Sequence, residues 1–341
     1  MPIALHTQTI IACIWDFDKT LIPGYSQQVI FDEFGIDAGS FWDEVNGLVE
    51  AYAQADVLVA KDTAYLGHML TYVKAGLMPG LSNTKLRELG ARIPLNPGLP
   101  EFLTTSQRLI VEDERYARHD IKVEHYVVST GMRALIEGSA VGELVNAIWA
   151  NDFIESPMSP GYLSNPPANT GPAEISQVGY MIDNTSKTRA VFEINKGVNV
   201  LDDVDVNTLI QPAERRVPIP HMVYIADGPS DIPVFSVMNQ YGGHNLAVFS
   251  SEGRSNFEEV KSLQDQGRVQ MIEHSLQVRD AASAADQAEV EVVGVVGDGD
   301  VDRLSVEGDG QRIVPVQPGA APVQLLRSAS RHVRNDDVKR R

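Results

Sequence analysis

The sequence is short of cysteine and of basic residues, and it contains no long apolar run. Cys13 is the only cysteine among 341 residues, so no disulfide can form within the chain, which favours a reduced, cytoplasmic setting. Residues 1–8 also lack the basic and apolar segments of a signal peptide. No stretch reaches the roughly eighteen consecutive apolar residues of a membrane-spanning helix. We therefore expect a cytoplasmic protein without a membrane partner.

Basic residues are outnumbered by acidic ones. Lys and Arg together number 28 against 46 Asp and Glu, which gives a formal charge of −18. Because phosphate backbones require a basic surface, this balance argues against a nucleic-acid partner. The apolar fraction of 43% is normal for a globular protein, so the chain has ample material for a core.

A segment with the character of a buried strand, residues 10–15, ends in two carboxylates, Asp16 and Asp18. Open α/β sheets bind their ligands at the carboxyl ends of their strands. Residues one apart in an extended segment point the same way, so both carboxylates can face one reacting group. An acidic turn after a strand is the simpler interpretation of this segment alone.

Helical periodicity follows directly after this strand. It predicts helices at 26–34, 40–55, 62–75 and 84–89. We interpret residues 24–92 as a helical cap inserted into a core that consists of residues 1–23 and 93–285.

An α/β pattern resumes after the predicted cap. It predicts strands at 123–129, 176–182, 222–226, 245–250 and 268–272, and a broken helical stretch at 132–149. The pattern therefore predicts an α/β fold, a doubly wound parallel sheet with a helical insertion after its first strand. Residues 286–341 change from acidic to basic, and their composition does not support a packed core, so we expect them to be a largely disordered tail.

Polar groups also mark three later points in the chain. They are Ser129-Thr130-Gly131 after a predicted strand, Lys187 at a helix start, and Asp227 with Asp231 after another strand. The carboxyl ends of parallel strands share one edge of a sheet, so these groups are expected to converge with Asp16 and Asp18. Each element alone is common for structural reasons. Their combination favours a functional site over an acidic turn.

This set of residues suits phosphoryl transfer. Asp16 would attack phosphorus to form an aspartyl-phosphate, and Asp18 would protonate the leaving oxygen and later activate water. Mg²⁺ would neutralise the charge between substrate and carboxylates, with Asp16, Asp227 and a backbone carbonyl as ligands. The Ser129 hydroxyl and the amides after it would hold phosphoryl oxygens, and Lys187 would add positive charge.

With these motifs in this order, residues 8–285 resemble the haloacid dehalogenase superfamily, and its phosphatases in particular. Asp16 to Thr20 resembles the first motif, and Ser129, Lys187 and the Asp227–Asp231 pair resemble the other three. The resemblance implies that Thr20 belongs to the phosphate-binding motif, that the backbone carbonyl of Asp18 binds Mg²⁺, and that Asp231 supports the metal site. It also implies that the α/β sheet is Rossmann-like and that the helical insertion is a mobile cap. Lys196 is the alternative candidate for the lysine of the third motif.

The layout is most similar to the phosphoserine phosphatase group, with one notable departure. Tyr25 stands where that group has a glutamate for the substrate's amino group, and this argues against phosphoserine as the substrate. Tyr25 lies just past the hinge at residues 23–24, so we interpret it as a specificity residue, with simple packing as the alternative.

The sequence thus predicts a Mg²⁺-dependent phosphatase for a small phosphorylated metabolite. Two alternatives remain, a phosphotransferase of the same fold and a non-catalytic protein that binds a phosphorylated metabolite. A pure binder has no need of the acid Asp18, which favours an enzyme. The sequence does not specify the metabolite or the oligomeric state.

Overall fold

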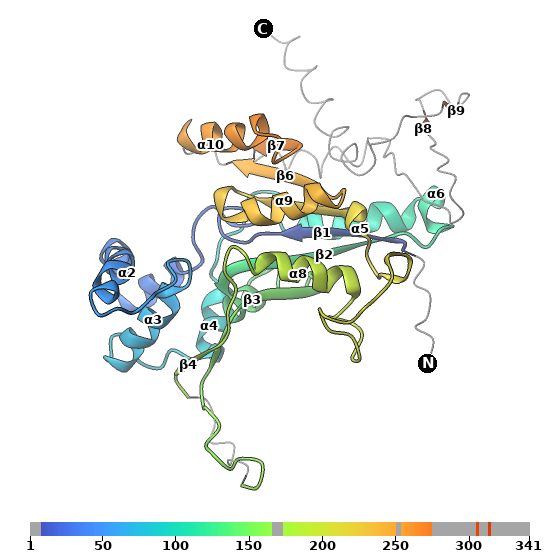
Figure 1. Ribbon diagram of the computed structural model, residues 1–341. Coiled ribbons are helices and arrows are strands. Elements are labelled where there is room, and N and C mark those ends of the chain that lie inside the picture. Colours follow the sequence, from blue (N-terminus) through green and yellow to red (C-terminus); the bar gives the residue numbers. More distant parts are fainter. Residues whose placement is uncertain (1–7, 166–172, 250–253, 275–304, 307–312, 315–341) are drawn as a thin grey trace.

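A seven-stranded sheet forms the centre of the molecule (Figure 1). The computed structural model describes residues 8–165, 173–249, 254–274, 305–306 and 313–314. The strands of the sheet are β1 (Ile10–Trp15), β2 (Lys122–Met132), β3 (Ala147–Ile154), β4 (Gln177–Tyr180), β5 (Met222–Ala226), β6 (His244–Phe249) and β7 (Met271–His274).

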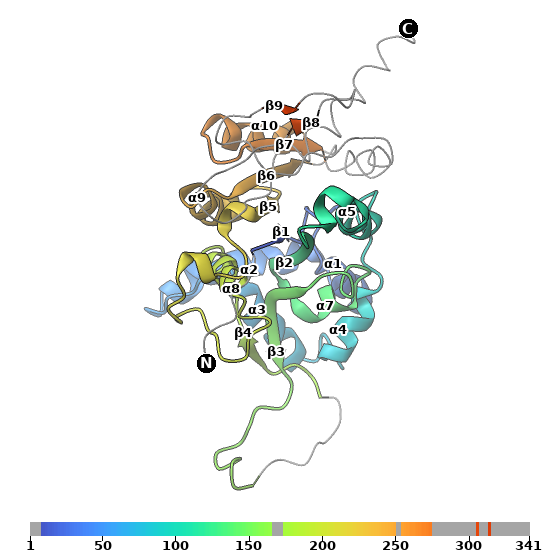
Figure 2. The ribbon, with the colours of Figure 1, turned by 90° about the vertical axis from the view of Figure 1, so that its right-hand side faces the viewer.

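The first strand of the chain lies in the middle of the sheet, whose order is β4-β3-β2-β1-β5-β6-β7 (Figure 2). Ile14 of β1 stands opposite Tyr126 of β2 and Tyr224 of β5, and both pairings are parallel. The edge strand β4 pairs with β3 in the antiparallel direction, and the other neighbours are parallel. This topology confirms the predicted doubly wound α/β fold.

Alternate residues of β1 contribute to two separate cores, as expected for a strand covered on both faces. Ala12 and Ile14 belong to one core, with residues of α8 (Lys187–Lys196), α9 (Ile232–Gln240) and α10 (Arg254–Asp265). Trp15 belongs to the other core, with residues of α5 (Glu101–Glu112) and α7 (Arg133–Gly138). In Figure 2, α8 and α9 lie on one side of the sheet, and α5 and α7 lie on the other.

The insertion after β1 comprises α1 (Gln28–Phe34), α2 (Ala38–Ala53), α3 (Ala64–Lys74) and α4 (Asn83–Gly90). Helices α2 and α3 lie beyond the end of the sheet toward which the arrow of β1 points (Figure 1). Helix α4 instead packs against α7 with its backbone. A β-carbon built on Gly90 would lie 2.2 Å from the Leu135 carbonyl oxygen, and one on Gly138 would lie 2.0 Å from the carbonyl oxygen of Arg87. The end of the insertion is therefore fixed to the core layer.

Two elements differ from the sequence-based expectation. Residues 147–149 begin strand β3, whereas the sequence predicted that they end a broken helical stretch, and only α7 within that stretch is helical. Helix α9 was not predicted at all. Its mixture of apolar and polar residues after Pro229 and Pro233 has weak helical periodicity, and it forms because Val234, Phe235 and Met238 are buried against the sheet.

The remaining elements are short. They are α6 (Glu114–Ala117) and the 3₁₀ helices η1 (Pro212–Glu214), η2 (Ile219–His221) and η3 (Pro229–Asp231). The predicted tail, residues 286–341, lies outside the described residues except for β8 (Ser305–Val306) and β9 (Ile313–Val314), which pair antiparallel. None of the helices within the described ranges combines the length and apolar character that a membrane crossing requires.

Candidate active site

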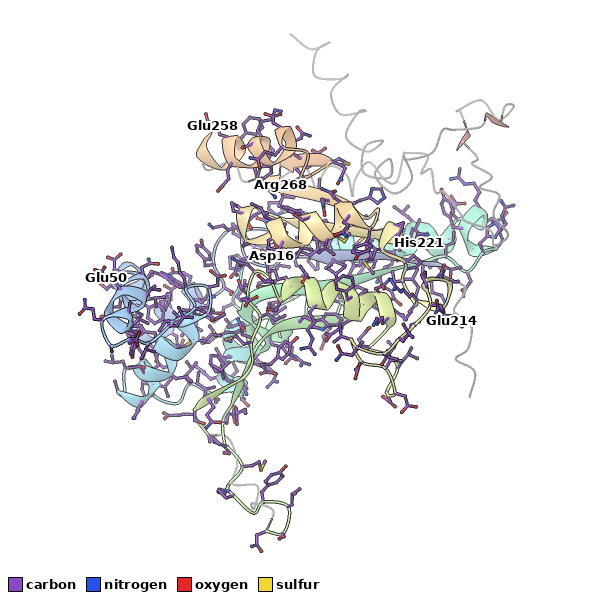
Figure 3. The ribbon with its side chains drawn as sticks, viewed as in Figure 1. Asp16, Glu50, Glu214, His221, Glu258 and Arg268 are labelled. Carbon is purple, nitrogen blue, oxygen red and sulfur yellow. The ribbon has the colours of Figure 1, made fainter. Side chains whose placement is uncertain are left out.

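Two buried carboxylates share the ammonium group of Lys187 at the carboxyl edge of the sheet. Asp16 directly follows β1, Lys187 is the first residue of α8, and Asp231 ends η3. Lys187 Nζ donates to Asp16 Oδ1 at 2.9 Å and to Asp231 Oδ1 at 2.7 Å. Figure 3 labels Asp16 at the end of the sheet that faces the inserted helices. The structure thus brings together residues from three of the four predicted motifs.

The charges in this cluster depend on one another. Burial alone would lower the pKa of Lys187, but the carboxylates of Asp16 and Asp231 outweigh burial and raise the pKa, so this lysine stays protonated. Burial also raises the pKa of Asp16 well above its usual range, and Lys187 opposes this effect. The Tyr224 hydroxyl donates to Asp231 Oδ1 at 2.6 Å, and the Ser230 hydroxyl donates to Asp231 Oδ2 at 2.7 Å. Asp231 is therefore held from three sides.

Asp227 completes a group of carboxylates that suits a metal ion. One carboxylate oxygen from each of Asp16, Asp227 and Asp231 lies within 4.8 Å of the others. Burial, and then the negative charge of Asp231, raise the pKa of Asp227 to about 6. Among the described residues, the Asp227 carboxylate has no hydrogen-bond donor. An all-oxygen set with excess negative charge is the chemistry that Mg²⁺ prefers, so these residues fit the expected ion.

Asp18 belongs to a second, neighbouring network. Its Oδ1 accepts a 2.8 Å hydrogen bond from the backbone amide of Ser26, at the start of the insertion. Burial raises the pKa of Asp18, although the hydrogen bond from the Ser26 amide opposes this effect. A carboxyl group with a raised pKa is suited to donate a proton and later accept one.

The Ser129-Thr130-Gly131 segment lies beside Asp18, at the end of β2. A β-carbon built on Gly131 would lie 3.2 Å from Ser129 Oγ, 3.2 Å from Ser26 Oγ and 3.7 Å from Asp18 Oδ2. The Gly131 amide donates to Ser129 Oγ at 2.9 Å, so this amide is occupied within the segment, whereas we expected it to face a ligand. The hydroxyl proton of Ser129 remains available for a ligand oxygen.

Tyr65 and Asn151 also reach this segment, although the sequence did not place them at the site. The Tyr65 hydroxyl, from α3, donates to the Thr130 carbonyl oxygen at 2.6 Å. Asn151 Nδ2, from β3, donates to the same oxygen at 2.5 Å and to the Tyr65 hydroxyl at 3.2 Å. The signal for Asn151 was a lone amide between Trp149 and Phe153 in an apolar segment. Tyr65 gave no signal, because its position fitted the helix core.

Three other candidates have distinct surroundings. Thr20 is buried, and its Oγ1 has no partner among the described residues. Tyr25 is 53% exposed, and Lys19 Nζ lies 4.3 Å from its ring centroid. Lys196 Nζ donates to the carbonyl oxygens of Val206 and Thr208 at 2.6 and 2.7 Å, so it holds a loop at the far end of α8. Lys187 alone of the two candidate lysines contacts Asp16.

Comparison with known proteins gives one relative of high similarity. No protein-family model matches the sequence. A protein of Borreliella burgdorferi described as uncharacterized is 37% identical over 266 residues, which cover 77% of this chain and 90% of that protein.

Several solved structures align with this one at low sequence identity. A haloacid dehalogenase family hydrolase from Salmonella enterica serovar Typhi aligns with a TM-score of 0.46 at 12% identity, over 80% of this chain and 69% of that chain. A phosphoserine phosphatase in apo form aligns at 0.44 and 14% identity, over 82% and 98%. A cytosolic 5′-nucleotidase IIIB bound to cytidine aligns at 0.42 and 12% identity, over 83% and 89%.

The fold found here is the one that the resemblance to the haloacid dehalogenase superfamily predicts, with a helical insertion after the central first strand. The sequence similarity extends over most of both chains. The chain belongs to the same protein family as the Borreliella burgdorferi protein.

Proposed function

We propose that the protein is a Mg²⁺-dependent phosphatase of the haloacid dehalogenase type that hydrolyses a small phosphorylated metabolite. The observation that carries this proposal is the convergence of Asp16, Asp18, Ser129, Lys187 and Asp227 from four distant segments at one edge of the sheet. The two acids sit in different networks, one with Lys187 and one with Ser26. Two carboxylates in different surroundings are suited to different steps.

Asp16 acts as the nucleophile in this proposal. Its Oδ2 attacks phosphorus while Oδ1 stays bonded to Lys187, and the bond from phosphorus to the ester oxygen breaks. Asp18 gives its proton to that oxygen, so the alcohol leaves neutral. Asp18 then takes a proton from water, whose oxygen attacks phosphorus and releases phosphate, which restores the Asp16 carboxylate.

Lys187 and Ser129 stabilise the transferring group. Lys187 places a fixed positive charge beside the attacking carboxylate, which offsets negative charge as it builds up on the phosphoryl oxygens. The Ser129 hydroxyl donates to one of these oxygens, and its own position is fixed because its Oγ accepts from Gly131. Tyr65 and Asn151 hold the Thr130 carbonyl and so keep the segment in place.

Mg²⁺ would be held by Asp16 and Asp227, with Asp231 and the backbone of Asp18 in support. When bound, it supplies positive charge that lets a phosphate dianion approach the carboxylates. The Asp227 carboxylate accepts no hydrogen bond from the described residues, unlike Asp16 and Asp231, so its role is best tested by substitution. The cytoplasmic setting expected from the sequence suits such an ion and a reduced Cys13.

The test is a Mg²⁺-dependent hydrolysis screen over p-nitrophenyl phosphate and a panel of phosphorylated metabolites. We expect release of inorganic phosphate that EDTA abolishes, with no increase in total turnover that depends on added alcohols. Mg²⁺ should also raise the melting temperature of the wild type, and less so that of Asp227→Asn, because a ligand of the folded state stabilises it. The absence of phosphate release from every ester would contradict the proposal.

A further inference from the structure

A buried glutamine at the start of the insertion has an oxygen atom without a partner. Gln27 is 3% exposed, and its Oε1 has no hydrogen-bond donor among the described residues. A buried acceptor without a partner destabilises the folded state, so such atoms are rare unless a ligand or water satisfies them. Its neighbour Gln28 is exposed and donates to Asp32 Oδ1 at 2.8 Å.

The side chain of Gln27 has no role in starting helix α1. Its backbone carbonyl accepts from the amides of Ile30 and Phe31 at 2.9 and 3.2 Å, while its side chain makes no capping hydrogen bond. A different side chain at this position would therefore leave the helix start in place. The formation of helix α1 therefore does not explain why the Gln27 carboxamide is buried.

Gln27 lies between the two networks that surround the proposed leaving group. The preceding residue, Ser26, binds the carboxylate of Asp18 through its amide, and its hydroxyl lies beside Gly131. On the other side, the Gln27 side chain is close enough to the Tyr65 hydroxyl to lower the pKa of Tyr65, and this hydroxyl in turn donates to the Thr130 carbonyl oxygen. Asp18, the proposed acid, is thus hydrogen-bonded to the residue that directly precedes Gln27.

We propose that Gln27 is a specificity residue whose Oε1 accepts a hydrogen bond from a hydroxyl group of the leaving alcohol, so that the substrate is the phosphate ester of a polyhydroxylated alcohol. This inference rests on the proposed phosphatase function. The carboxamide is neutral, so it satisfies a neutral donor without requiring a second charge in the buried space. A site built to bind a hydroxyl discriminates strongly against the ester without one, because its acceptor is then left unpaired.

This inference also revises the part assigned to Tyr25. Its ring is half-exposed and is engaged by Lys19 and Trp42, so it lies at the rim of the insertion. The polar selection of substrate falls instead to Gln27, two residues later and fully enclosed.

The experiment compares kcat/KM for 2-hydroxyethyl phosphate and ethyl phosphate, which differ by one hydroxyl group, with p-nitrophenyl phosphate as the reference ester. In the wild type, we expect the hydroxylated ester to be favoured by about 10–100-fold. Gln27→Met, which keeps side-chain length but removes the acceptor, should reduce this ratio to about 2 or less. Gln28→Met is the matched control and should keep the wild-type ratio.

A second variant keeps the test decisive if Gln27→Met melts at a much lower temperature. Gln27→Glu retains the shape of the side chain and adds a charge, so it should shift preference toward 2-aminoethyl phosphate. A wild-type ratio near 1, a ratio that survives Gln27→Met, or a wild-type preference for the ammonium ester would each overturn the role of Gln27 while leaving the phosphatase proposal intact. Lack of hydrolysis of all esters, p-nitrophenyl phosphate included, would overturn both.

Discussion

The two ends of the same sheet each hold an ionic cluster, partly buried at one end and buried at the other, and the clusters differ in charge balance. At the amino end of β2, Glu124 accepts hydrogen bonds from the Arg216 guanidinium at 2.5 and 2.8 Å and from the Tyr126 hydroxyl. At the carboxyl end, Asp16 and Asp231 share Lys187, and Asp227 lies in the same group. The first cluster pairs one anion with one cation, whereas the second has an excess of anions.

This difference in charge balance distinguishes a balanced ion pair from the cluster that we propose as a metal site. The Glu124–Arg216 pair is complete once the chain folds, so it needs nothing from outside. The carboxylates around Lys187 repel one another. The pKa of Asp227 is raised to about 6, first by burial and then by the negative charge of Asp231. An excess of buried negative charge is relieved by a cation, which supports the proposed metal site at this end of the sheet.

The largest expected effect is that of Asp16→Asn. We expect kcat for any phosphate ester to fall by at least about 10⁴-fold, because an amide oxygen is a poor nucleophile. The melting temperature should stay constant or rise, because one of the mutually repelling carboxylates is removed. Steady-state kinetics and thermal melts measure the two effects. Retained turnover would break the comparison, since the anion excess would then have no catalytic purpose.

The two lysines of α8 offer a matched pair with the next largest effect. Lys187→Met should lower kcat by about 10³-fold, because it removes the charge beside Asp16. Lys196→Met should leave kcat unchanged and cost about 1–2 kcal/mol of unfolding free energy, because it removes hydrogen bonds from Lys196 to two loop carbonyls. Equal losses of activity in both variants would contradict the assignment of Lys187.

Between the two clusters, His125 of β2 gives a prediction about pH. Trp15 Nε1 donates to His125 Nδ1 at 3.1 Å, so the neutral ring carries its proton on Nε2, and protonation of Nδ1 would set two donors against each other. Burial lowers the pKa of His125 to about 4. Between about pH 6.5 and 4 the unfolded chain therefore binds a proton at this residue that the folded chain does not.

The unfolding free energy should consequently fall as pH decreases through that window, by about 3 kcal/mol on account of this residue. Urea denaturation of the wild type and His125→Gln at pH 7 and pH 4 measures the difference between the two slopes. Identical pH dependence in the two proteins would contradict a neutral, buried His125. This effect concerns the stability of the fold and does not depend on the difference in charge balance between the two ionic clusters.

The smallest effect expected is that of Glu124→Gln at the balanced end of the sheet. It should cost about 1–3 kcal/mol of unfolding free energy, because Arg216 loses its charged partner in a largely buried position. The kcat value should not change, since Glu124 lies at the opposite end of the sheet from Asp16. A loss of activity without a loss of stability would contradict the division between the two clusters.

Much of the fold was predictable because apolar strands end abruptly in polar residues. The segment 222–226 agrees with β5 at both ends, and Ile10–Trp15 emerged as the central strand. Strand β3 was missed because Asn151 and Asp152 interrupt its apolar pattern. The amide of Asn151 is satisfied only by partners from other segments, among them the Ile182 amide, which donates to its Oδ1 at 2.7 Å.

The candidate site was predictable where its residues follow predicted strands or begin a predicted helix. Asp16 and Asp18 follow strand β1, and Lys187 begins helix α8. Their convergence is therefore expected from the order of strands and helices in a parallel sheet. Tyr65 and Gln27 belong to inserted helices, whose placement over the sheet depends on tertiary packing, and no periodicity in the sequence indicates it. The sequence therefore indicated the type of chemistry better than the choice of substrate.

The close contact between Gly90 and Gly138 has a consequence for how this family can diversify. The backbones of α4 and α7 are in contact there, so neither glycine position tolerates a larger residue. Helix α4, at the end of the insertion, is therefore fixed in position against α7. Helices α2 and α3 precede that contact in the chain, and their buried residues pack in one core with Trp15, the residue before Asp16. The family can therefore vary the exposed surface of the insertion, whereas the core that carries Asp16 constrains its buried residues.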